Sequence, residues 1–353
     1  MTTQRGDNHT MTKHRVVQWA TGNIGTRALR AVIEHPTLDL VGLWVHSPDK
    51  AGRDAGELCG LEPALVTATN DIDDVIALGP DCVLYMPRAL DADEVCLLLA
   101  AGINVVTTRG EFHHPPSMDP ALRERVEAAC ATGGTSIHST GSSPGFITEA
   151  VPIVLTSIQR RLDQLTIDEF ADLSRRDSPD LLFEIMGFGR PPAAFSEARL
   201  QHGRTSFGPS LRALADALGL TLDDIEAGGE VAVASRTVEI AAGTVEAGTV
   251  AAQRLTVTGL RNGRPLLRFR ANWYCTTELD PAWDLLSTGW RISVEGDTPL
   301  DVDLRFPFPI EQMAEHSPGY TAHRAVNAVP VVCAAAPGIR TTAELPHVIA
   351  ALG

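Results

Sequence analysis

The sequence predicts an α/β protein with a doubly wound parallel sheet, followed by an α+β domain with a mixed or antiparallel sheet. Two observations predict the parallel sheet. Short β-branched runs alternate with helical segments over residues 15–140, and a glycine-containing turn joins the first run to the first helix. A third observation predicts the second domain, because after Gly145 the strands become longer and follow one another directly.

The expected elements of the first domain follow in chain order. Strands are expected at 15–20, 40–46, 65–70, 81–86, 103–108 and 135–140, with helices at 24–35, 53–59, 71–78, 91–101 and 119–132. Asp91 and the Asp119-Pro120 pair are typical of helix starts. Gly102 and Gly133 follow their helices, where left-handed backbone is usual.

The expected elements of the second half are fewer and longer. They are a helix at 146–160, a strand at 165–174, helices at 179–187 and 206–219, strands at 230–241, 248–261, 264–276, 289–296 and 300–306, a helix at 320–336 and a short helix after Thr342. Asn262-Gly263 predicts a type I′ hairpin turn. The expected division is a disordered arm at 1–13, domains at 14–145 and 146–318, and a helical segment at 319–353.

Composition limits the class of protein. The chain has 353 residues, of which 44% are hydrophobic, and its net charge is −15. That charge disfavours nucleic acid and anionic membranes as partners. The cysteines are not spaced as zinc ligands, so we expect no metal site. Residues 1–14 lack the apolar segment of a secretory signal, and no apolar run reaches about 20 residues, so a cytoplasmic protein is expected.

The first glycine turn has the pattern A-x-G-x-x-G, formed by Ala20, Gly22 and Gly25. Glycine at position 22 would let a pyrophosphate approach the backbone, and Gly25 would let the helix pack against the strand. Alanine in the first position is expected to require only a slightly wider turn. The predicted dinucleotide-binding residues of this turn are Thr21, Gly22, Asn23, Ile24 and Gly25; an ordinary tight turn is the alternative.

The end of the second strand indicates which dinucleotide is bound. It carries His46, Ser47, Lys50 and Arg53, whereas NAD sites usually place an acidic residue there. Asp49 lies further along and is expected to point outward. NADP is therefore the expected cofactor, and NAD is the alternative. A second alternative is that these residues form a solvated basic loop that binds no cofactor.

Other cofactor-binding candidates lie where later strands end and near the C-terminus. They are Met86, Pro87, Thr108, Gly141 and Asn327. Asn327 has a donor and an acceptor that suit the nicotinamide carboxamide, and an interhelix hydrogen bond is the alternative.

Glu111 is the candidate catalytic residue. It lies in an apolar loop after the fifth strand, and a carboxylate there can act as acid or base near neutral pH. A surface role is the alternative. The expected substrate pocket includes Ser143, Phe146 and Phe170, with core packing as the alternative for the two aromatic residues.

The segments "WATGNIG", "TRGE", "STGSSPGF" and "AVNAVP" together resemble the dihydrodipicolinate reductase-like family. The resemblance is closer to its branch of native amine dehydrogenases and 2,4-diaminopentanoate dehydrogenases, including mycobacterial members. It implies an N-terminal Rossmann domain, an α+β domain for substrate and dimer contacts, and a C-terminal helix that returns to the first domain. It also implies that the glutamate of "TRGE", Glu111, is the catalytic carboxylate.

The function implied by this resemblance is an NAD(P)H-dependent amine dehydrogenase. Such an enzyme aminates small ketones or aldehydes with ammonia and carries out the reverse oxidative deamination, and we expect a homodimer. True dihydrodipicolinate reductases carry a histidine pair and a lysine in the second domain, and nothing in 147–240 matches them. The alternatives are an NADP-dependent imine or carbonyl reductase and a nucleotide-binding protein without turnover.

Overall fold

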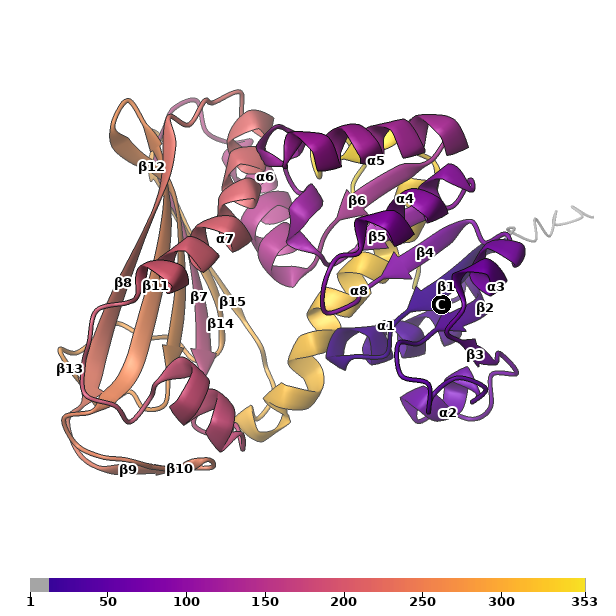
Figure 1. Cartoon of the computed structure of the whole chain (residues 1–353). Helices are drawn as coiled ribbons and strands as arrows, with labels where there is room; N and C mark the ends of the chain where they lie inside the picture. The colour runs from indigo at the N-terminus through magenta and orange to yellow at the C-terminus, as the bar shows by residue number, and fades with distance from the viewer. Residues whose placement is uncertain (1–12, 353) are drawn as a thin grey trace, which may run out of the picture. The chain divides into compact units, whose positions relative to one another are not determined.

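The structure is a computed structural model that describes residues 13–352 (Figure 1). Nearly all of the arm expected at 1–13 therefore lies outside the described residues. The chain divides into two compact units. The first comprises the residues up to Gly141 together with those from Pro318 onward, and the second is Ser142–Ser317.

The first unit contains a seven-stranded parallel sheet with the order β16-β6-β5-β4-β1-β2-β3. Its strands are β1 (His14–Trp19), β2 (Leu38–Trp44), β3 (Ala68–Thr69), β4 (Cys82–Tyr85), β5 (Asn104–Thr107), β6 (Ser136–Ser139) and β16 (Gly338–Arg340). The strand expected at 65–70 is reduced to two residues. Strand β16 was not predicted, because three residues are too few to show an alternating pattern.

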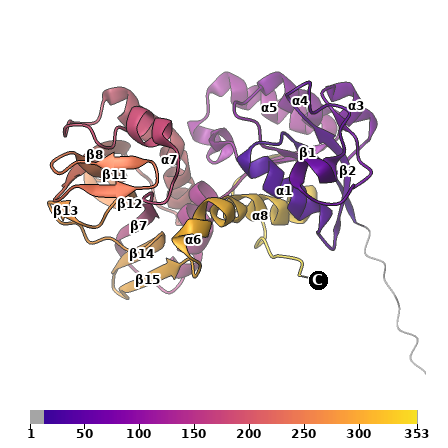
Figure 2. The same cartoon turned by 90° about the horizontal axis from the view of Figure 1, so that it is seen from below.

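Helices cover both faces of this sheet. They are α1 (Asn23–Ile33), α2 (Ala55–Cys59), α3 (Ile72–Ala77), α4 (Ala92–Ala100), α5 (Pro120–Gly133) and α8 (Met313–Cys333). Successive side chains of a strand point to opposite faces. Val16 and Leu84 accordingly pack in the core shared with α1 and α8 (Figure 2), whereas Val17 and Val83 pack in the core shared with α4 and α5. The predicted doubly wound sheet is confirmed.

Two details at helix ends differ from the predictions. Gly102 has a positive φ of 90°, as expected, but Gly133 is the last residue of α5 and the left-handed residue is Gly134, with φ of 68°. A Cβ on Gly133 would lie 1.9 Å from the Leu99 carbonyl oxygen, so this glycine permits α5 to approach α4 closely. The short helix expected after Thr342 is wrong, because residues 342–344 form a turn.

The second unit contains a seven-stranded mixed sheet with the order β13-β8-β11-β12-β7-β14-β15. Its strands are β7 (Leu162–Asp172), β8 (Asp224–Ala234), β11 (Val250–Arg261), β12 (Arg264–Tyr274), β13 (Leu279–Asp280), β14 (Gly289–Gly296) and β15 (Leu300–Arg305). Only β7 and β12 pair in parallel. The hairpin at Asn262-Gly263 is confirmed, because both residues have positive φ, 53° and 69°.

Helical segments cover one face of this sheet. Apolar residues of α7 (Glu197–Ala217) pack there with the kinked segment Ser142–Ala150 and with α6 (Val151–Thr156). A further helical turn, Asp180–Met186, packs beside the small hairpin of β9 (Val238–Ile240) and β10 (Gly243–Val245). The α+β class of this unit is confirmed.

Two boundaries of the second unit were predicted wrongly. The strand expected at 230–241 ends at Ala234, and residues 238–240 belong to the separate β9. The helix expected at 206–219 starts at Glu197, after an N-cap at Ser196. The helix start was missed because glycine, which has a low helix propensity, stands at position 203. A Cβ at this position would lie 2.9 Å from the Leu255 side chain, so the close packing of α7 requires the glycine.

Candidate active site

The turn after β1 has a left-handed residue at Ala20, with φ of 73°. The expected slightly wider turn is therefore wrong, since alanine adopts the conformation that glycine usually supplies, at a cost of about 1–2 kcal/mol. The buried side chain of Gln18 stabilises this turn. Its Nε2 donates hydrogen bonds to the carbonyl oxygens of Trp19 and Ala20, both at 3.0 Å.

Gly25 allows α1 to begin directly against this turn. A Cβ on Gly25 would lie 2.2 Å from the Ala20 carbonyl oxygen and 3.1 Å from Nε2 of Gln18. The sequence predicted this close packing correctly. The orientation of α1, and hence of its N-terminus, depends on the absence of a side chain at position 25.

The N-terminus of α1 has no side-chain cap, whereas the N-termini of the helices α2 to α5 are capped. Helices α2 to α5 each begin with an aspartate whose side chain accepts backbone N–H groups. The N-cap residue of α1 is Gly22, which has no side chain to cap the helix, and the first turn of α1 has no acidic residue. A Cβ on Gly22 would have no neighbour within 4 Å. These N–H groups and the helix dipole can therefore receive an external anion such as a diphosphate.

A cation from the loop after β2 reaches this turn. Nζ of Lys50 donates a hydrogen bond to Oγ1 of Thr21 at 3.0 Å. Ser47 lies in the same loop and is half-buried, while His46 and Arg53 are exposed. Asp49 is also exposed, in agreement with its expected outward position. The loop thus places positive charge beside the glycine turn and no carboxylate at the end of β2.

Glu111 lies in a single helical turn, Gly110–Phe112, immediately after β5. The fully buried Phe112 anchors this turn in the core. One carboxylate oxygen, Oε1, lies 2.6 Å from Nη2 of Arg109. The other oxygen, Oε2, is buried and has no hydrogen-bond partner in the described part of the chain. One oxygen is thus fixed, and the other is a buried acceptor without a partner among the described residues.

Arg109 is itself held in place at both ends. Nη1 of Arg109 donates to the Arg88 carbonyl oxygen at 2.8 Å, and Oγ of Ser139 donates to the Arg109 carbonyl oxygen at 2.6 Å. Arg109 was not predicted from the sequence. Its place two residues before Glu111, directly before the turn Gly110–Phe112, is the signal that could have identified it.

The remaining cofactor candidates of the first unit lie at neighbouring strand ends. Met86 is buried and Pro87 half-buried after β4, and Thr108 is half-buried after β5. Gly141 is buried two residues after β6. Because these strands are parallel, all four residues lie at the carboxyl edge of the sheet, where ligands bind in open α/β folds.

Asn327, the remaining cofactor candidate, lies on α8 and not at a strand end. It is half-buried and lies close to His35, just beyond the end of α1, where burial lowers the pKa of the imidazole. Near the end of α8, the Val332 carbonyl oxygen accepts a hydrogen bond from Oγ of Ser136, the first residue of β6. The nicotinamide contact of Asn327 stays a prediction, with an interhelix hydrogen bond as its alternative.

The pocket residues expected in the second unit are separated by the sheet. Phe146 packs in the core on the helix-covered face, where its ring centroid lies 6.3 Å from that of Trp290. Phe170 is buried in the core of the opposite face with Tyr274. Core packing, the alternative given for Phe170, fits this placement. The hydroxyl oxygen of Ser143 is buried and has no hydrogen-bond partner among the described residues.

The fold and the glycine turn together define a protein with a Rossmann-type first domain and an α+β second domain. A solved structure of an amine dehydrogenase from Mycobacterium smegmatis shares this fold. Its TM-score is 0.69 at 20% identity, and the match covers 97% of this chain and 98% of that one.

Comparison with known sequences identifies the family of this chain. An amine dehydrogenase from Streptomyces virginiae is 29% identical over 343 residues, covering 94% of this chain and 95% of the relative. A 2,4-diaminopentanoate dehydrogenase from Acetoanaerobium sticklandii is 22% identical over 303 residues, covering 83% and 80%. Residues 146–353 match the family model of the 2,4-diaminopentanoate dehydrogenase C-terminal domain, and the chain belongs to this family. The resemblance inferred from the four segments is confirmed.

Replacing Gly25 by alanine should destabilise the first unit, because the new methyl group would overlap the Ala20 carbonyl oxygen. We expect the free energy of unfolding to fall by about 1–3 kcal/mol, as for other overpacked sites. Gly22→Ala is the matched control, since nothing surrounds that position. Chemical denaturation of both variants measures the difference, and equal stabilities would contradict the packing argument.

Proposed function

We propose that this protein is an NAD(P)H-dependent amine dehydrogenase. It aminates small ketones or aldehydes with ammonia and catalyses the reverse oxidative deamination of primary amines. The observation that carries the proposal is Glu111, whose Oε1 is held by Arg109 and whose Oε2 is buried without a partner in the described chain. The family and the amine dehydrogenase relative support the reaction class.

The residues of the glycine turn fit a dinucleotide. The backbone of Thr21–Gly25 and the open N-terminus of α1 would hold the diphosphate, and Lys50 would add a positive charge beside it. We propose NADP rather than NAD, because Ser47, Lys50 and Arg53 lie near the end of β2 without a carboxylate at that end. The bound nucleotide supplies the hydride chemistry.

Glu111 would act on the proton and the charge of the substrate. Ammonia adds to the carbonyl carbon and the resulting carbinolamine loses water. Oε2 of Glu111 would take a proton from ammonium or from the carbinolamine and would stabilise the cationic iminium carbon that accepts hydride. Arg109 is the positioning residue, because it holds Oε1 and leaves Oε2 to face the substrate.

The variant Glu111→Gln tests the catalytic role. It should lose amination by at least about 100-fold, the usual contribution of a general base, while still binding NADPH. NADPH consumption with a panel of carbonyl compounds, with and without ammonium, provides the measurement. Glu124→Gln, an exposed site on α5, is the control. Wild-type rates in the Glu111 variant would refute the assigned role, and consumption without ammonium would indicate a carbonyl or imine reductase.

The variant Gly22→Asp tests the nucleotide site. An aspartate at this position can cap α1, so the fold should persist, but its charge would repel the diphosphate and NADPH binding should be lost. Titration of tryptophan fluorescence with NADPH and NADH measures binding, and thermal unfolding measures the fold. Unchanged titration curves in this variant would contradict the assignment of the turn.

The variant Arg109→Met tests the positioning role. Without its partner the Glu111 carboxylate should sample more orientations, so kcat should fall by about 10-fold or more while KM for NADPH changes little. Arg109→Lys should restore part of the loss. Arg125→Gln, which removes an exposed arginine paired with Asp93, is the control. A rise of KM for NADPH with unchanged kcat would argue against positioning.

A further inference from the structure

The first unit is built from two separate pieces of the chain. One piece runs up to Gly141 and the other begins at Pro318, with the whole second unit between them in the sequence. The C-terminal piece contains most of α8 and the strand β16, which pairs with β6. All cysteines of the chain are free, so no disulfide joins the two pieces in this structure.

Two cysteines lie where these pieces meet. Cys82 is the first residue of β4, and Cys333 is the last residue of α8. Sγ of Cys333 lies 3.7 Å from the carbonyl oxygen of Asp81, the residue directly before Cys82, and both cysteine side chains pack in the same apolar core. Burial raises the pKa of the Cys82 thiol, and the adjacent Cys333 raises it further. The two thiols are therefore neighbours, although they come from different pieces of the chain.

The end of α8 is fixed at this place by a further contact. The Val332 carbonyl oxygen accepts its 2.7 Å hydrogen bond from Oγ of Ser136, the first residue of β6. Cys82 and Ser136 both begin strands of the parallel sheet, so the two contacts of α8 lie at the amino edge of that sheet. The glycine turn lies at the opposite, carboxyl edge. A covalent bond between the thiols would therefore leave the proposed nucleotide site unobstructed.

The two thiols differ in their access to solvent. Cys333 is half-buried, whereas Cys82 is completely buried. Their hydrogen bonds are long and weak, since each sulfur donates to a backbone carbonyl oxygen at 3.7 Å, Cys82 to Val83 and Cys333 to Asp81. Oxidants react with accessible thiols first, so Cys333 is the thiol that a small peroxide can reach. Cys82 is then placed to react with the oxidised Cys333.

We propose that Cys82 and Cys333 form a reversible disulfide when a peroxide oxidises the protein, and that this bond joins the two pieces of the first unit. The Cys333 thiolate attacks one oxygen of hydrogen peroxide, the O–O bond breaks, and the leaving hydroxide takes up a proton. The product is a sulfenic acid on Cys333. The Cys82 sulfur attacks the Cys333 sulfur, the S–S bond forms, and the hydroxyl group leaves with the Cys82 proton as water.

The electron balance of this reaction is complete. Two thiols and one hydrogen peroxide give one disulfide and two molecules of water. A small thiol compound reverses the reaction by thiol–disulfide exchange. The bond would form whether or not the protein oxidises amines, so the inference does not depend on the proposed function.

Peptide mapping tests the proposal. The folded protein is treated with hydrogen peroxide, the remaining thiols are alkylated, and the peptides are analysed by mass spectrometry without reduction. We expect a linked peptide pair that joins Cys82 to Cys333 and disappears on reduction. Cys333→Ser and Cys82→Ala should each lack this pair. Cys96→Ser is the matched control and should still form it, because Cys96 is half-buried like Cys333 but packs on the other face of the sheet.

Thermal unfolding measures the consequence of the bond. A link between distant parts of the chain restricts the unfolded state, so the oxidised wild type should unfold at a temperature roughly 5 °C or more above that of the reduced protein. The difference should vanish in Cys333→Ser. This variant changes only a half-buried residue, so it keeps the comparison valid if Cys82→Ala does not fold.

Several outcomes would overturn the proposal. One is a sulfenic acid that persists on Cys333 without the linked pair, and another is no oxidation of either residue by peroxide that oxidises free cysteine in the same solution. A linked pair that forms only in denaturant would also overturn it, because the fold would then keep the thiols apart. An equal or lower unfolding temperature of the linked protein would show that the bond does not hold the two pieces together.

Discussion

The geometry of the first unit depends on the contact between the Ala20 carbonyl and the side-chain-free position 25. Gln18 stabilises this contact, because its buried amide binds the carbonyl oxygens of the turn while Ala20 adopts left-handed backbone. Helix α1 can then begin directly at the end of β1, with its first N–H groups exposed above Gly22. The uncapped start of α1 is thus a consequence of a packing constraint, and the strain at Ala20 is offset by buried hydrogen bonds.

The proposed catalytic carboxylate shows how a loop residue acquires a defined position. Phe112 anchors the turn, and Ser139 holds the backbone of the preceding residue. The guanidinium of Arg109 binds only one oxygen of Glu111 and is itself bound to the backbone of residue 88. The Glu111 side chain is therefore held rigidly, but its Oε2 lacks a hydrogen-bond donor among the described residues. A buried acceptor without a donor lowers the stability of a structural loop, and such exceptions are expected at functional sites.

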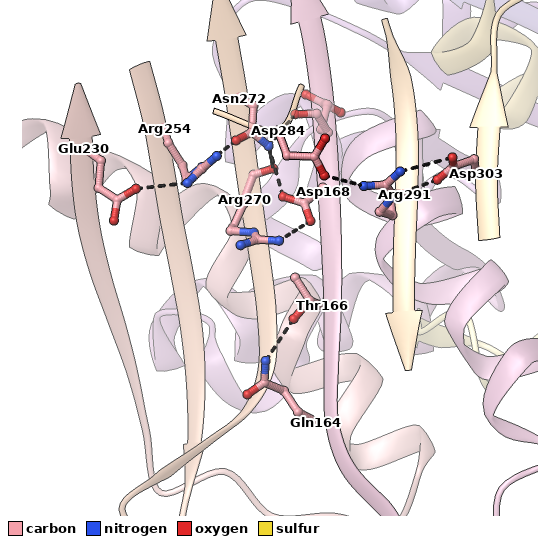
Figure 3. A network of polar contacts seen from close by, with 11 residues as sticks. Gln164, Thr166, Asp168, Glu230, Arg254, Arg270, Asn272, Asp284, Arg291 and Asp303 are labelled. Atoms are coloured by element: carbon pink, nitrogen blue, oxygen red, sulfur yellow. Dashed lines mark hydrogen bonds and ion pairs between the residues drawn. The ribbon is translucent and has the colours of Figure 1, made fainter. Parts of the chain in front are cut away.

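The two faces of the sheet in the second unit differ in their polar contacts. On one face of the sheet, arginines and carboxylates pair across neighbouring strands, as Arg254 does with Glu230 and Arg291 does with Asp303 (Figure 3). On the helix-covered face, Glu169 accepts a hydrogen bond from Nε1 of Trp290. The alternation of a β-strand places these two environments one residue apart.

The sequence alone determined the features that follow from local chemistry. The period of apolar residues identified the parallel sheet, the glycine turn located the start of α1, and the "TRGE" segment pointed to Glu111. Only the tertiary structure decided which partner each side chain meets. The pairing of Arg109 with Glu111 and the placement of Phe170 in a core each depend on which other elements the fold brings next to the residue. Such contacts leave no periodic signal, because the residues that make them are chosen by the packing of whole elements.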